Sequence, residues 1–370
     1  MKIRLVSALA MMAGPTTTAP AADFSGLLSR ISLPPGFTIS VFAEMPGPRS
    51  IDIDEATGVI YVGSRRGHVY SLVDQNGDGV ADEVIERADG LNVPNGVAVR
   101  DGNLYIGLQD RIVRWSPPDA ADTTRPIEPL VTVRDGLMNK RSHGWRYTDF
   151  GPDGKLYVAL GAPCNICDLE QNTGKIARMN PDGSDWEIVA DGVRNSVGFD
   201  WHPATGELWF TDNGADGMGD DVPPDELNRV TAAGQHFGYP YFGGKNTKLA
   251  GYDDEEPMGE VTPAEIEFQA HSANLGIDFY DGSMFPAEYR NDAFVAQHGS
   301  WNRSEPVGYR IMRVRFDEAG NAIDRQVFAD GWLDGDTTIG RPVDIEELPD
   351  GSILVSDDFA DVIYRISYDG

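Results

Sequence analysis

The sequence contains few cysteines, few positive charges and no long apolar segment after its N-terminus. Its 370 residues include 2 cysteines, and 30 lysines and arginines stand against 59 aspartates and glutamates, which leaves a formal net charge of -29. A field of this sign repels phosphate backbones and anionic lipids, so we exclude nucleic acid and membrane surfaces as expected partners. No later stretch approaches the roughly 18 apolar residues that indicate a transmembrane helix, so we expect no membrane span.

Apolar and turn-forming residues are plentiful. Hydrophobic residues make up 41% of the chain and aromatic residues 9%, which is enough to bury a substantial core and excludes disorder for most of the chain. The 42 glycines and 24 prolines exceed the share of an average globular protein. This composition favours a fold with many tight turns.

The first 22 residues have the layout of a secretory signal peptide. Two basic residues among the first four precede an apolar run from Leu5 to Gly14, and Ala19-Pro20-Ala21 offers a small-residue cleavage site. The run is too short to span a membrane, although it could also form a buried N-terminal helix. We therefore expect cleavage near Ala22 and a mature chain of residues 23–370 that forms a single domain and is periplasmic or secreted.

Both cysteines lie in one short segment, at Cys164 and Cys167. In the oxidising compartment that a signal peptide implies, a local disulfide is the favoured interpretation. A haem-attachment motif is excluded because Asp168 rather than histidine follows, and zinc would need two further ligands nearby. A thioredoxin-like redox pair fits poorly, because the flanking sequence has no β-α-β pattern.

A short phrase recurs six times along the chain. Each copy has a turn, then a β-rich run that usually holds an aromatic residue, then an exit loop. The copies occupy residues 58–63, 102–107, 154–159, 206–211, 291–296 and 351–356. The first four are 44, 52 and 52 residues apart, close to the ~40–50 residues of one propeller blade. The repetition predicts an all-β fold, a six-bladed β-propeller of four-stranded antiparallel blades.

One further strand is expected before the first copy of the phrase. Residues 37–42 alternate between apolar and polar side chains for most of their length, as a strand does. We predict that this segment completes the last blade near Ile363 and thereby closes the ring. Closure would protect the sheet edges that an open array of blades leaves exposed.

Polar motifs stand just outside the strands at equivalent points of successive repeats. They are Ser142-His143-Gly144, Val193-Arg194-Asn195, Asn213-Gly214-Ala215, Asp225-Glu226-Leu227-Asn228, the segment from His298 to Arg303, and Gly340-Arg341-Pro342. A propeller concentrates loop side chains at one end of its axis, so we expect these groups to converge. A neutral imidazole would be a natural general base in such a site, because imidazole can titrate near neutral pH.

This set of motifs resembles the soluble pyrroloquinoline-quinone (PQQ) sugar dehydrogenases, the glucose/sorbosone dehydrogenase family, over roughly residues 33–368. The resemblance implies an oxidoreductase that depends on PQQ and calcium. Such an enzyme transfers hydride from a sugar hydroxyl or hemiacetal, of an aldose, sorbosone or related compound, to PQQ. It then passes the electrons to an external acceptor, a quinone or a cytochrome.

The resemblance also implies roles for individual residues. It makes His143 the catalytic base and places around the cofactor Arg65, Arg194, Asn195, His298, Arg303 and Arg341. Arginine suits this task because it can clamp the three carboxylates of PQQ in a bidentate manner. The backbone carbonyls of Gly214 and Ala215 would hold calcium, a hard cation that prefers oxygen ligands.

Two positions depart from the glucose dehydrogenases. Ala162 stands where those enzymes have an aspartate that orients the base, which leaves Asp168 or Asn165 as candidate replacements. Val343 stands where some relatives have a second arginine, and lysine is absent at the position of His298. The cofactor clamp is therefore closer to the sorbosone-type branch.

An acidic loop after the first repeat begins like a calcium-binding EF-hand. Oxygen ligands for a structural calcium would come from Asp74, Asn76, Asp78 and Asp82. However, Ile85 replaces the glutamate expected at loop position twelve, and the alternative is an acidic hairpin turn without metal. The remaining histidines are expected to be ordinary loop or packing residues: His68, His202, His236 and His271.

Two other functions stay open. A calcium-dependent lactonase on a six-bladed propeller would use carboxylates and amides to bind the metal and activate water. It would not need the ring of cations that a tricarboxylate requires, so the arginines favour the dehydrogenase. A non-catalytic propeller that binds a partner or a glycan is the third interpretation.

Overall fold

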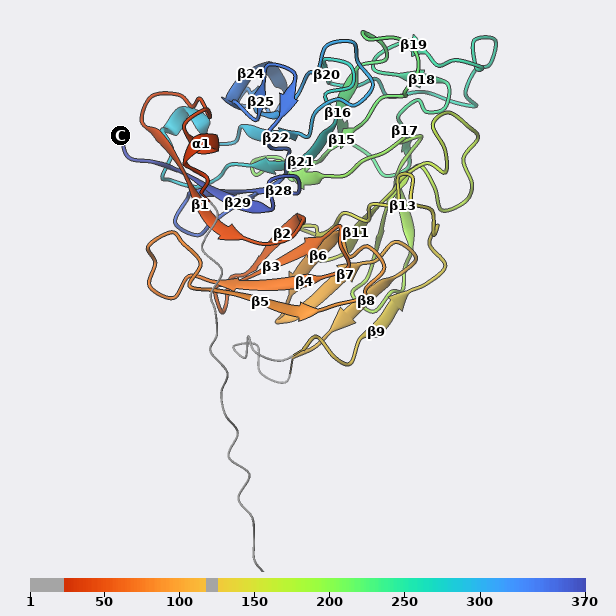
Figure 1. The fold of residues 1–370 in the computed structure, drawn as a ribbon. Coiled ribbons are helices and arrows are strands. Elements are labelled where there is room, and N and C mark those ends of the chain that lie inside the picture. The colour runs from red at the N-terminus through yellow and green to blue at the C-terminus, as the bar shows by residue number, and fades with distance from the viewer. Residues whose placement is uncertain (1–22, 118–125) are drawn as a thin grey trace, which may run out of the picture.

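The structure is a computed structural model and describes residues 23–117 and 126–370. The predicted signal peptide, residues 1–22, lies outside the described residues. Within the described part of the chain, the strands form six main sheets, arranged around a central axis as a β-propeller (Figure 1). The predicted all-β, six-bladed fold is therefore confirmed.

The blades follow one another along the chain, and the repeated phrase forms most of the second strand of each. Blade 1 contains β2 (Pro48–Asp54), β3 (Val59–Ser64), β4 (Val69–Val73) and β5 (Glu83–Ala88). Blade 2 contains β6 (Gly96–Arg100), β7 (Asn103–Gly107), β8 (Ile112–Trp115) and β9 (Val131–Arg134). Blade 3 contains β10 (Thr148–Phe150), β11 (Leu156–Leu160), β12 (Lys175–Met179) and β13 (Glu187–Asp191).

The second half of the ring has the same plan. Blade 4 contains β14 (Phe199–Trp201), β15 (Leu208–Asp212), β16 (Asp225–Val230) and β20 (Ile266–Phe268). Blade 5 contains β21 (Asn274–Phe279), β22 (Ala293–Gln297), β23 (Arg310–Phe316) and β24 (Ala322–Asp330). Blade 6 contains β27 (Pro342–Glu347), β28 (Ile353–Asp357), β29 (Val362–Tyr368) and β1 (Phe37–Glu44).

Blade 3 departs from the predicted four-stranded antiparallel form. A fifth strand, β17 (Gln235–His236), pairs in parallel with β13 at its outer edge. The short elements outside the blades are α1 (Ser25–Leu28), η1 (Ala287–Tyr289), β18 (Phe242–Gly243), β19 (Thr247–Lys248), β25 (Leu333–Asp334) and β26 (Thr337–Thr338). Among the described residues, no helix has the length and apolar character needed to cross a membrane.

The ring is closed as predicted, because β1 from the N-terminal side pairs with β29 from the C-terminus. In this antiparallel ladder Phe37 lies opposite Tyr368, and Ala43 lies opposite Ile363. Figure 1 shows the two strands, red and blue, side by side in one blade. The ring of Phe37 also packs edge-on against Phe285 of blade 5, with centroids 4.8 Å apart. Closure therefore joins both ends of the described chain to the same core.

The core is divided among clusters that lie between successive blades. The aromatic residues of the repeats each enter such a cluster and are 4% exposed or less: Tyr61, Tyr105, Tyr157, Trp209 and Phe294. Trp209 of blade 4, for example, packs with Ile277 and Val295 of blade 5. Each buried aromatic side chain removes about 150–250 Å² of surface from contact with water. The repeated aromatic position therefore makes a large contribution to the packing of one blade against the next.

Carboxylates on the innermost strands add polar links between blades. Asp200 Oδ2 accepts a hydrogen bond from the Phe279 N–H at 2.6 Å, and Asp344 Oδ2 accepts one from the Ile51 N–H at 3.0 Å. An innermost strand is a sheet edge, so these N–H groups have no ladder partner of their own. Burial raises the pKa of both aspartates to about 7.

Candidate active site

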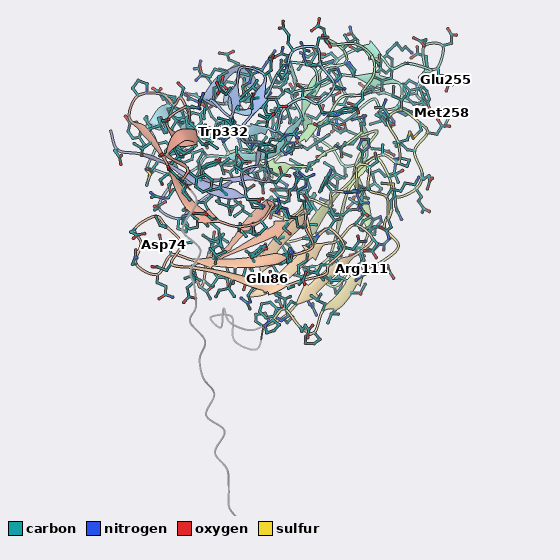
Figure 2. The ribbon with its side chains drawn as sticks, viewed as in Figure 1. Asp74, Glu86, Arg111, Glu255, Met258 and Trp332 are labelled. Carbon is teal, nitrogen blue, oxygen red and sulfur yellow. A yellow bond between two sulfur atoms is a disulfide. The ribbon has the colours of Figure 1, made fainter. Side chains whose placement is uncertain are left out.

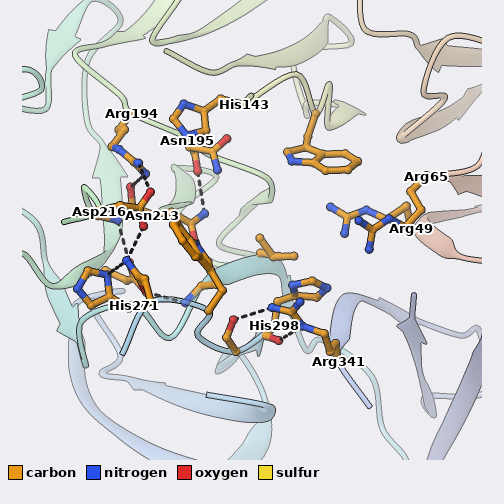
Figure 3. Close-up of a pocket in the computed structure, with 18 residues that line it drawn as sticks. Arg49, Arg65, His143, Arg194, Asn195, Asn213, Asp216, His271, His298 and Arg341 are labelled. Carbon is orange, nitrogen blue, oxygen red and sulfur yellow. Dashed lines mark hydrogen bonds and ion pairs between the residues drawn. The ribbon is translucent and has the colours of Figure 1, made fainter. Parts of the chain in front are cut away.

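Side chains from blades 1, 3, 4, 5 and 6 line a cavity of about 270 Å³ (Figure 3). The predicted residues that line it are Arg65, His143, Arg194, Asn195, Gly214, His298 and Arg341. The sequence analysis assigned no individual role in the site to other lining residues, among them Arg49, Trp145, Asp216, His271, Trp301 and Asn302. The structure thus brings most of the predicted site residues to one place.

His143 is oriented by a backbone carbonyl. Its Nδ1 lies 3.0 Å from the carbonyl oxygen of Ala162. This is the position at which the sequence has no aspartate to orient the base. Because a carbonyl oxygen can only accept, Nδ1 carries the proton and Nε2 keeps its lone pair. His143 has a left-handed φ of 52°, and Gly161 makes room for it, since a Cβ on that glycine would lie 2.5 Å from the Cβ of His143.

Neither candidate replacement for the missing aspartate hydrogen-bonds to His143. The Asp168 carboxylate instead accepts a hydrogen bond from the Tyr252 hydroxyl at 2.8 Å. Asn165 binds Arg194, whose Nε donates to its carbonyl oxygen at 3.0 Å and whose Nη2 donates to its side-chain oxygen at 2.7 Å. Both suggestions from the sequence are therefore wrong, and a main-chain group performs the task.

The imidazole of His143 is held neutral. Burial, together with the positive charge of Arg194, lowers its pKa to about 4, against the opposing effect of the hydrogen bond to Ala162. A histidine with the ordinary pKa of about 6.5 would be partly protonated near neutral pH. His143 is instead a free base at pH 7, with Nε2 available to accept a proton.

Asp358 ties three residues of the cavity together. Its Oδ2 accepts hydrogen bonds from Arg49 Nη1 at 3.0 Å and from Arg65 Nη1 at 2.8 Å. Its Oδ1 accepts one from His298 Nε2 at 2.8 Å. Burial opposes the charge of Asp358, but His298 and the two arginines outweigh it and hold the pKa of its carboxyl well below the usual range. Burial also lowers the pKa of His298 to about 4, so its neutral ring donates Nε2–H to an ionised carboxylate.

The repeats carry a signal for Asp358 that the sequence analysis did not use. Arg65, His298 and Asp358 each lie three residues beyond the valine that pairs with an inner-strand isoleucine of the same blade. The same position of successive blades therefore supplies a cation, an imidazole and the carboxylate that binds both. Aligning the blades at this register would have marked Asp358 as a residue of the site.

Arg49 and Trp145 form a stacked wall of the cavity. The Arg49 guanidinium lies 4.4 Å from the centroid of the Trp145 ring, and that of Arg65 lies 5.9 Å from it. Arg49 is 2% exposed, and its Nε donates to Asn95 Oδ1 at 2.9 Å. Cation–π stacking and the ion pair with Asp358 hold the buried Arg49 in place, whereas Arg65, whose side chain is 42% exposed, makes the same ion pair from the rim of the cavity.

Two of the predicted cofactor-binding arginines, Arg303 and Arg341, come from the last third of the chain, and they differ in whether they line the cavity. Arg341 lines the cavity, where its Nε donates to the carbonyl of His298 at 2.8 Å and its Nη2 to that of Gly299 at 2.7 Å. Arg303 is not among the residues that line the cavity. Its guanidinium donates to the carbonyl of Asp220 and lies 3.4 Å from the Asp221 carboxylate. Of the two, the structure brings Arg341 alone to the site.

Arg194 is held by neighbouring loops on several sides. Its guanidinium donates to two main-chain carbonyls, to the Asn165 side chain and to the Asp216 carboxylate, the last at 3.0 Å. Asn165 belongs to the short loop closed by a disulfide between Cys164 and Cys167, which confirms the favoured interpretation of that segment. Arg194 therefore organises the cavity wall and contributes positive charge, with most of its donors already used.

A chain of hydrogen bonds follows the wall beyond Arg194. Asp216 Oδ1 accepts from Asn302 Nδ2 at 2.8 Å, and the same nitrogen lies 3.3 Å from His271 Nδ1. His271 Nε2 donates to the Gly219 carbonyl at 2.8 Å, which leaves Nδ1 as the acceptor. His271 was expected to be an ordinary packing residue and is instead part of the cavity wall, as Figure 3 shows.

One of the two predicted calcium ligands, Gly214, lines the same cavity as Asn195. Gly214 lines the cavity and donates its N–H to the buried Asp225 at 2.8 Å, whereas Ala215 is buried next to it and does not line the cavity. The Asn195 N–H donates to Asp212 Oδ1 at 2.6 Å. The side-chain oxygen of Asn195 is buried and has no hydrogen-bond partner in the described part of the chain. A buried oxygen of this kind suits a cation or a donating ligand.

The acidic loop between β4 and β5 lies at the edge of blade 1, where Figure 2 labels Asp74. The Asp74 carboxylate accepts from the N–H groups of Gly77 and Gly79 at 2.8 and 2.9 Å. Asp82 likewise accepts from the Gln75 N–H at 2.7 Å and from the side chain of Asn76 at 3.1 Å. The predicted ligands therefore share one compact loop, and calcium there stays a prediction.

Comparison with known proteins gives the family. A model of the family described as "Glucose / Sorbosone dehydrogenase" matches residues 105–365. An uncharacterized protein from Borreliella burgdorferi is 37% identical over 358 residues, which cover 93% of this chain and 92% of that protein.

Two solved structures share the fold at 19% sequence identity. The calcium structure of a Trichoderma reesei enzyme of carbohydrate-active family AA12 has a TM-score of 0.78 and aligns over 92% of this chain and 97% of that one. The holo form of the PQQ domain of pyranose dehydrogenase from Coprinopsis cinerea has a TM-score of 0.76, over 91% and 97%.

Fold and cavity together define a six-bladed β-propeller with a cation-rich site formed by loops from most of its blades. Because the family model matches well over half of the chain, the protein belongs to the glucose/sorbosone dehydrogenase family and is an oxidoreductase of that family. The resemblance found in the sequence motifs is confirmed.

Proposed function

We propose that the protein is a PQQ- and calcium-dependent dehydrogenase that transfers hydride from a sugar hydroxyl or hemiacetal to PQQ. The similar structure from Coprinopsis cinerea is a PQQ domain, and the one from Trichoderma reesei is a calcium structure. The observation that carries the proposal is a neutral, oriented imidazole that shares one cavity with a group of guanidinium side chains.

The residues present fit a planar tricarboxylate. Arg49, Arg65 and Arg341 bring guanidinium groups to the cavity, and guanidinium is the side-chain group best matched to carboxylates. Trp145 adds a flat aromatic surface to the same wall. When bound there, PQQ would supply the ortho-quinone that takes up two electrons.

His143 would remove the hydroxyl proton of the substrate. Its Nε2 is the free lone pair, and the hydrogen bond from Nδ1 to Ala162 can persist after Nε2 is protonated. The nearby charge of Arg194 disfavours the imidazolium, which favours release of the proton once hydride transfer is complete. The ring is therefore suited to repeated proton uptake and release.

Calcium would be held on the Gly214 side of the cavity. We propose the backbone carbonyls of Gly214 and Ala215 as ligands, and the unpartnered oxygen of Asn195 lies in the same wall. A structural calcium in the loop of Asp74 and Asp82 is a separate proposal.

The substrate would be an aldose, sorbosone or a related compound, and the electron acceptor a quinone or a cytochrome. The sequence pattern of residues 1–22 supports export to the periplasm or the medium. N-terminal sequencing of the exported protein should find Ala22 or Asp23 first, and an intact Met1 would contradict export by cleavage.

Reconstitution tests the function directly. Purified apoprotein is mixed with PQQ and calcium, the quinone absorbance is followed, and a panel of sugars is then offered with an artificial electron acceptor. We expect a change in the quinone spectrum and sugar-dependent reduction of the acceptor, both lost on removal of calcium by a chelator. Lactone hydrolysis without PQQ would favour the lactonase instead, and neither activity nor PQQ binding would favour a non-catalytic propeller.

A further inference from the structure

We propose that blade 1 carries a second kind of metal site, a zinc-type site formed by His68, Glu86 and Asp89. Within residues 23–117 and 126–370, these three are the one group of metal-binding side chains whose ligand atoms all lie within 4.8 Å of one another. None of the three lines the cavity, so the inference does not rest on the proposed dehydrogenase activity.

The spacing of the ligand atoms matches zinc. His68 Nδ1 lies 3.3 Å from Glu86 Oε2 and 3.4 Å from Asp89 Oδ1. Ligands arranged as a tetrahedron around zinc, with bonds of about 2.0–2.1 Å, are about 3.3–3.4 Å apart. Three protein ligands would thus occupy three corners, and the fourth corner would be open to water.

The His68 ring nitrogen that faces the two carboxylates is not used in a hydrogen bond among the described residues. The His68 side chain is 24% exposed, but its Nδ1 atom is buried and makes no hydrogen bond within residues 23–117 and 126–370, although two carboxylate oxygens are near. A good N–H···O bond would be about 2.9–3.0 Å long and well aligned. An imidazole nitrogen that faces two carboxylate oxygens at these distances leaves a place for a cation that all three groups would share.

Backbone elements hold the three ligands in place. His68 directly precedes β4, Glu86 lies within β5, and Asp89 directly follows β5. The His68 N–H donates to Ser64 Oγ at 3.0 Å, and its ring lies against Tyr70 with centroids 5.8 Å apart. A register shift in the β4–β5 ladder brings Glu86 opposite Tyr70, next to the imidazole.

Comparison with other blades shows what is special about blade 1. The corresponding ladder position holds a permanent cation opposite an aspartate: Lys175 pairs with Asp191 in blade 3, and Arg310 pairs with Asp330 in blade 5. In blade 1 the aspartate of this position is Asp89, and His68 stands in place of the lysine or arginine. The positive charge that blades 3 and 5 carry at this position is therefore absent from the corresponding position of blade 1.

The second difference adds negative charge. Glu86 stands where blades 3 and 5 have Ile188 and Val327. Two carboxylates and an imidazole that can be neutral leave a place for a divalent cation. The mixed nitrogen and oxygen donors favour zinc and similar first-row metals over calcium, which takes oxygen ligands.

The site would brace the loop between β3 and β4. This loop runs from Arg65 to His68, and Arg65 lines the cavity and donates a hydrogen bond to Asp358. A metal on His68 would tie the far end of the loop to β5, on the part of blade 1 where Figure 2 labels Glu86. We expect the metal to stabilise the protein without taking part in the reaction.

Zinc titration tests the site. The untagged mature protein is titrated calorimetrically with zinc, in excess calcium that fills oxygen-only sites. Wild type should bind one equivalent that His68→Lys lacks. This variant recreates the lysine–aspartate pair of blade 3, so we expect it to fold. Asp135→Asn is the matched control, because Asp135 occupies the place of Asp89 in blade 2 and should not affect binding.

Two further measurements complete the test. Glu86→Gln should weaken zinc binding by at least about tenfold, given that even supporting residues around a metal contribute about 10–100-fold. Zinc should raise the melting temperature of wild type but not that of His68→Lys. Equal zinc binding by wild type and His68→Lys, or none by wild type, would overturn the proposal. None of these readouts uses PQQ or sugar turnover, so failure here is separable from failure of the proposed function.

Discussion

His143 takes its orientation from the main chain, so the side chain at position 162 is not needed to fix its tautomer. An aspartate in that role would add a negative charge and raise the pKa of the imidazole. Here a neutral carbonyl opposes burial and the charge of Arg194, and the pKa falls to about 4. The ring is a weaker base than an aspartate-assisted one, but it is deprotonated over a wider range of pH.

The role of His143 is testable by substitution. His143→Gln should lower turnover about 10²–10⁴-fold, the usual contribution of a positioned general base. It should retain PQQ, because the guanidinium groups are unchanged. Turnover at saturating PQQ and PQQ affinity by absorbance titration separate the two effects, and His236→Gln, outside the cavity, is the control. Weakened PQQ binding with normal turnover at high PQQ would make His143 a binding residue.

The pH profile tests the environment of the same residue. Because burial and Arg194 lower the pKa of His143 to about 4, the base is protonated only below that value. Turnover should therefore stay level on the acid side until about pH 4 to 5 and then fall. The measurement is turnover against pH at saturating substrate, with folding checked at each pH by circular dichroism. An acid limb near pH 6.5 would show that the imidazole is not desolvated.

Substitution of Asp358 should lower the affinity for PQQ more than it lowers turnover. Asp358→Asn leaves Arg49 buried without a full counter-charge and releases Arg65 and His298. We expect PQQ affinity to fall at least about tenfold, since a charge-assisted hydrogen bond contributes about 1.5–3 kcal/mol. Turnover at saturating PQQ should change much less.

Asp361→Asn is the matched control for Asp358. It lies in the same turn but pairs with Arg66, and both side chains are more than 40% exposed. An exposed pair contributes little, so PQQ affinity should not change. Equal effects of the two substitutions would contradict the anchoring role of Asp358.

At the scale of the elements, β1 closes the ring by pairing with β29. Phe37→Ala should destabilise the protein by about 3–5 kcal/mol, because it removes a buried ring that contacts blade 5 as well as Tyr368. Thr38→Ala, the exposed next residue of the same strand, should have a small effect. Urea unfolding measures both, and a similar effect of the two substitutions would mean that β1 adds pairing but no packing.

The elements that came from the repeats were predictable, whereas β17 was not. Each blade places an apolar alternation and an aromatic residue in the second strand, and both are local patterns. β17 consists of Gln235 and His236, a pair with no strand pattern of its own. It becomes a strand because the loop after β16 passes beside the free edge of β13, and such an edge can pair with any extended segment.

For the whole molecule, the buried carboxylates of the inner strands govern how stability depends on pH. Burial raises the pKa of Asp52, Asp200 and Asp344 to about 7 and that of Asp149 and Glu346 well above the usual range. In the unfolded chain an aspartate titrates near 3.9. Between about pH 4 and 7 the folded protein thus binds more protons than the unfolded chain, so its stability falls as the pH rises.

This sign gives a measurable outcome. The apoprotein, with chelator present, should melt at a higher temperature at pH 5.5 than at pH 7.5. His143 and His298, whose pKa values are lowered to about 4, act in the opposite direction and make the folded protein more stable as the pH rises. This gain ends near pH 6.5, where the histidines of the unfolded chain also lose their protons. The buried carboxylates outnumber these two histidines, so we expect their effect to dominate. Scanning calorimetry at the two values measures the difference. A melting temperature that is equal or higher at pH 7.5 would show that the inner carboxylates are solvated or paired.

By itself, the sequence determined the architecture and the membership of most of the site. Strand alternation, turn residues and one aromatic per repeat are short-range patterns, so six copies in order define six blades. The copies also leave one strand missing at the end, which residues 37–42 supply. Polar motifs that follow equivalent strands of a propeller converge whatever the details of the loops, and this is why most of the predicted residues line one cavity.

The tertiary structure alone decided which of those groups touch. His298 and Arg303 belong to one motif, yet one binds Asp358 while the other turns towards Asp220. Asp358 meets Arg49 from the other end of the chain only because ring closure brings the last blade beside the first. Hydrogen bonds and ion pairs act over a few ångströms, and loop paths set distances on that scale, so no sequence pattern contains them.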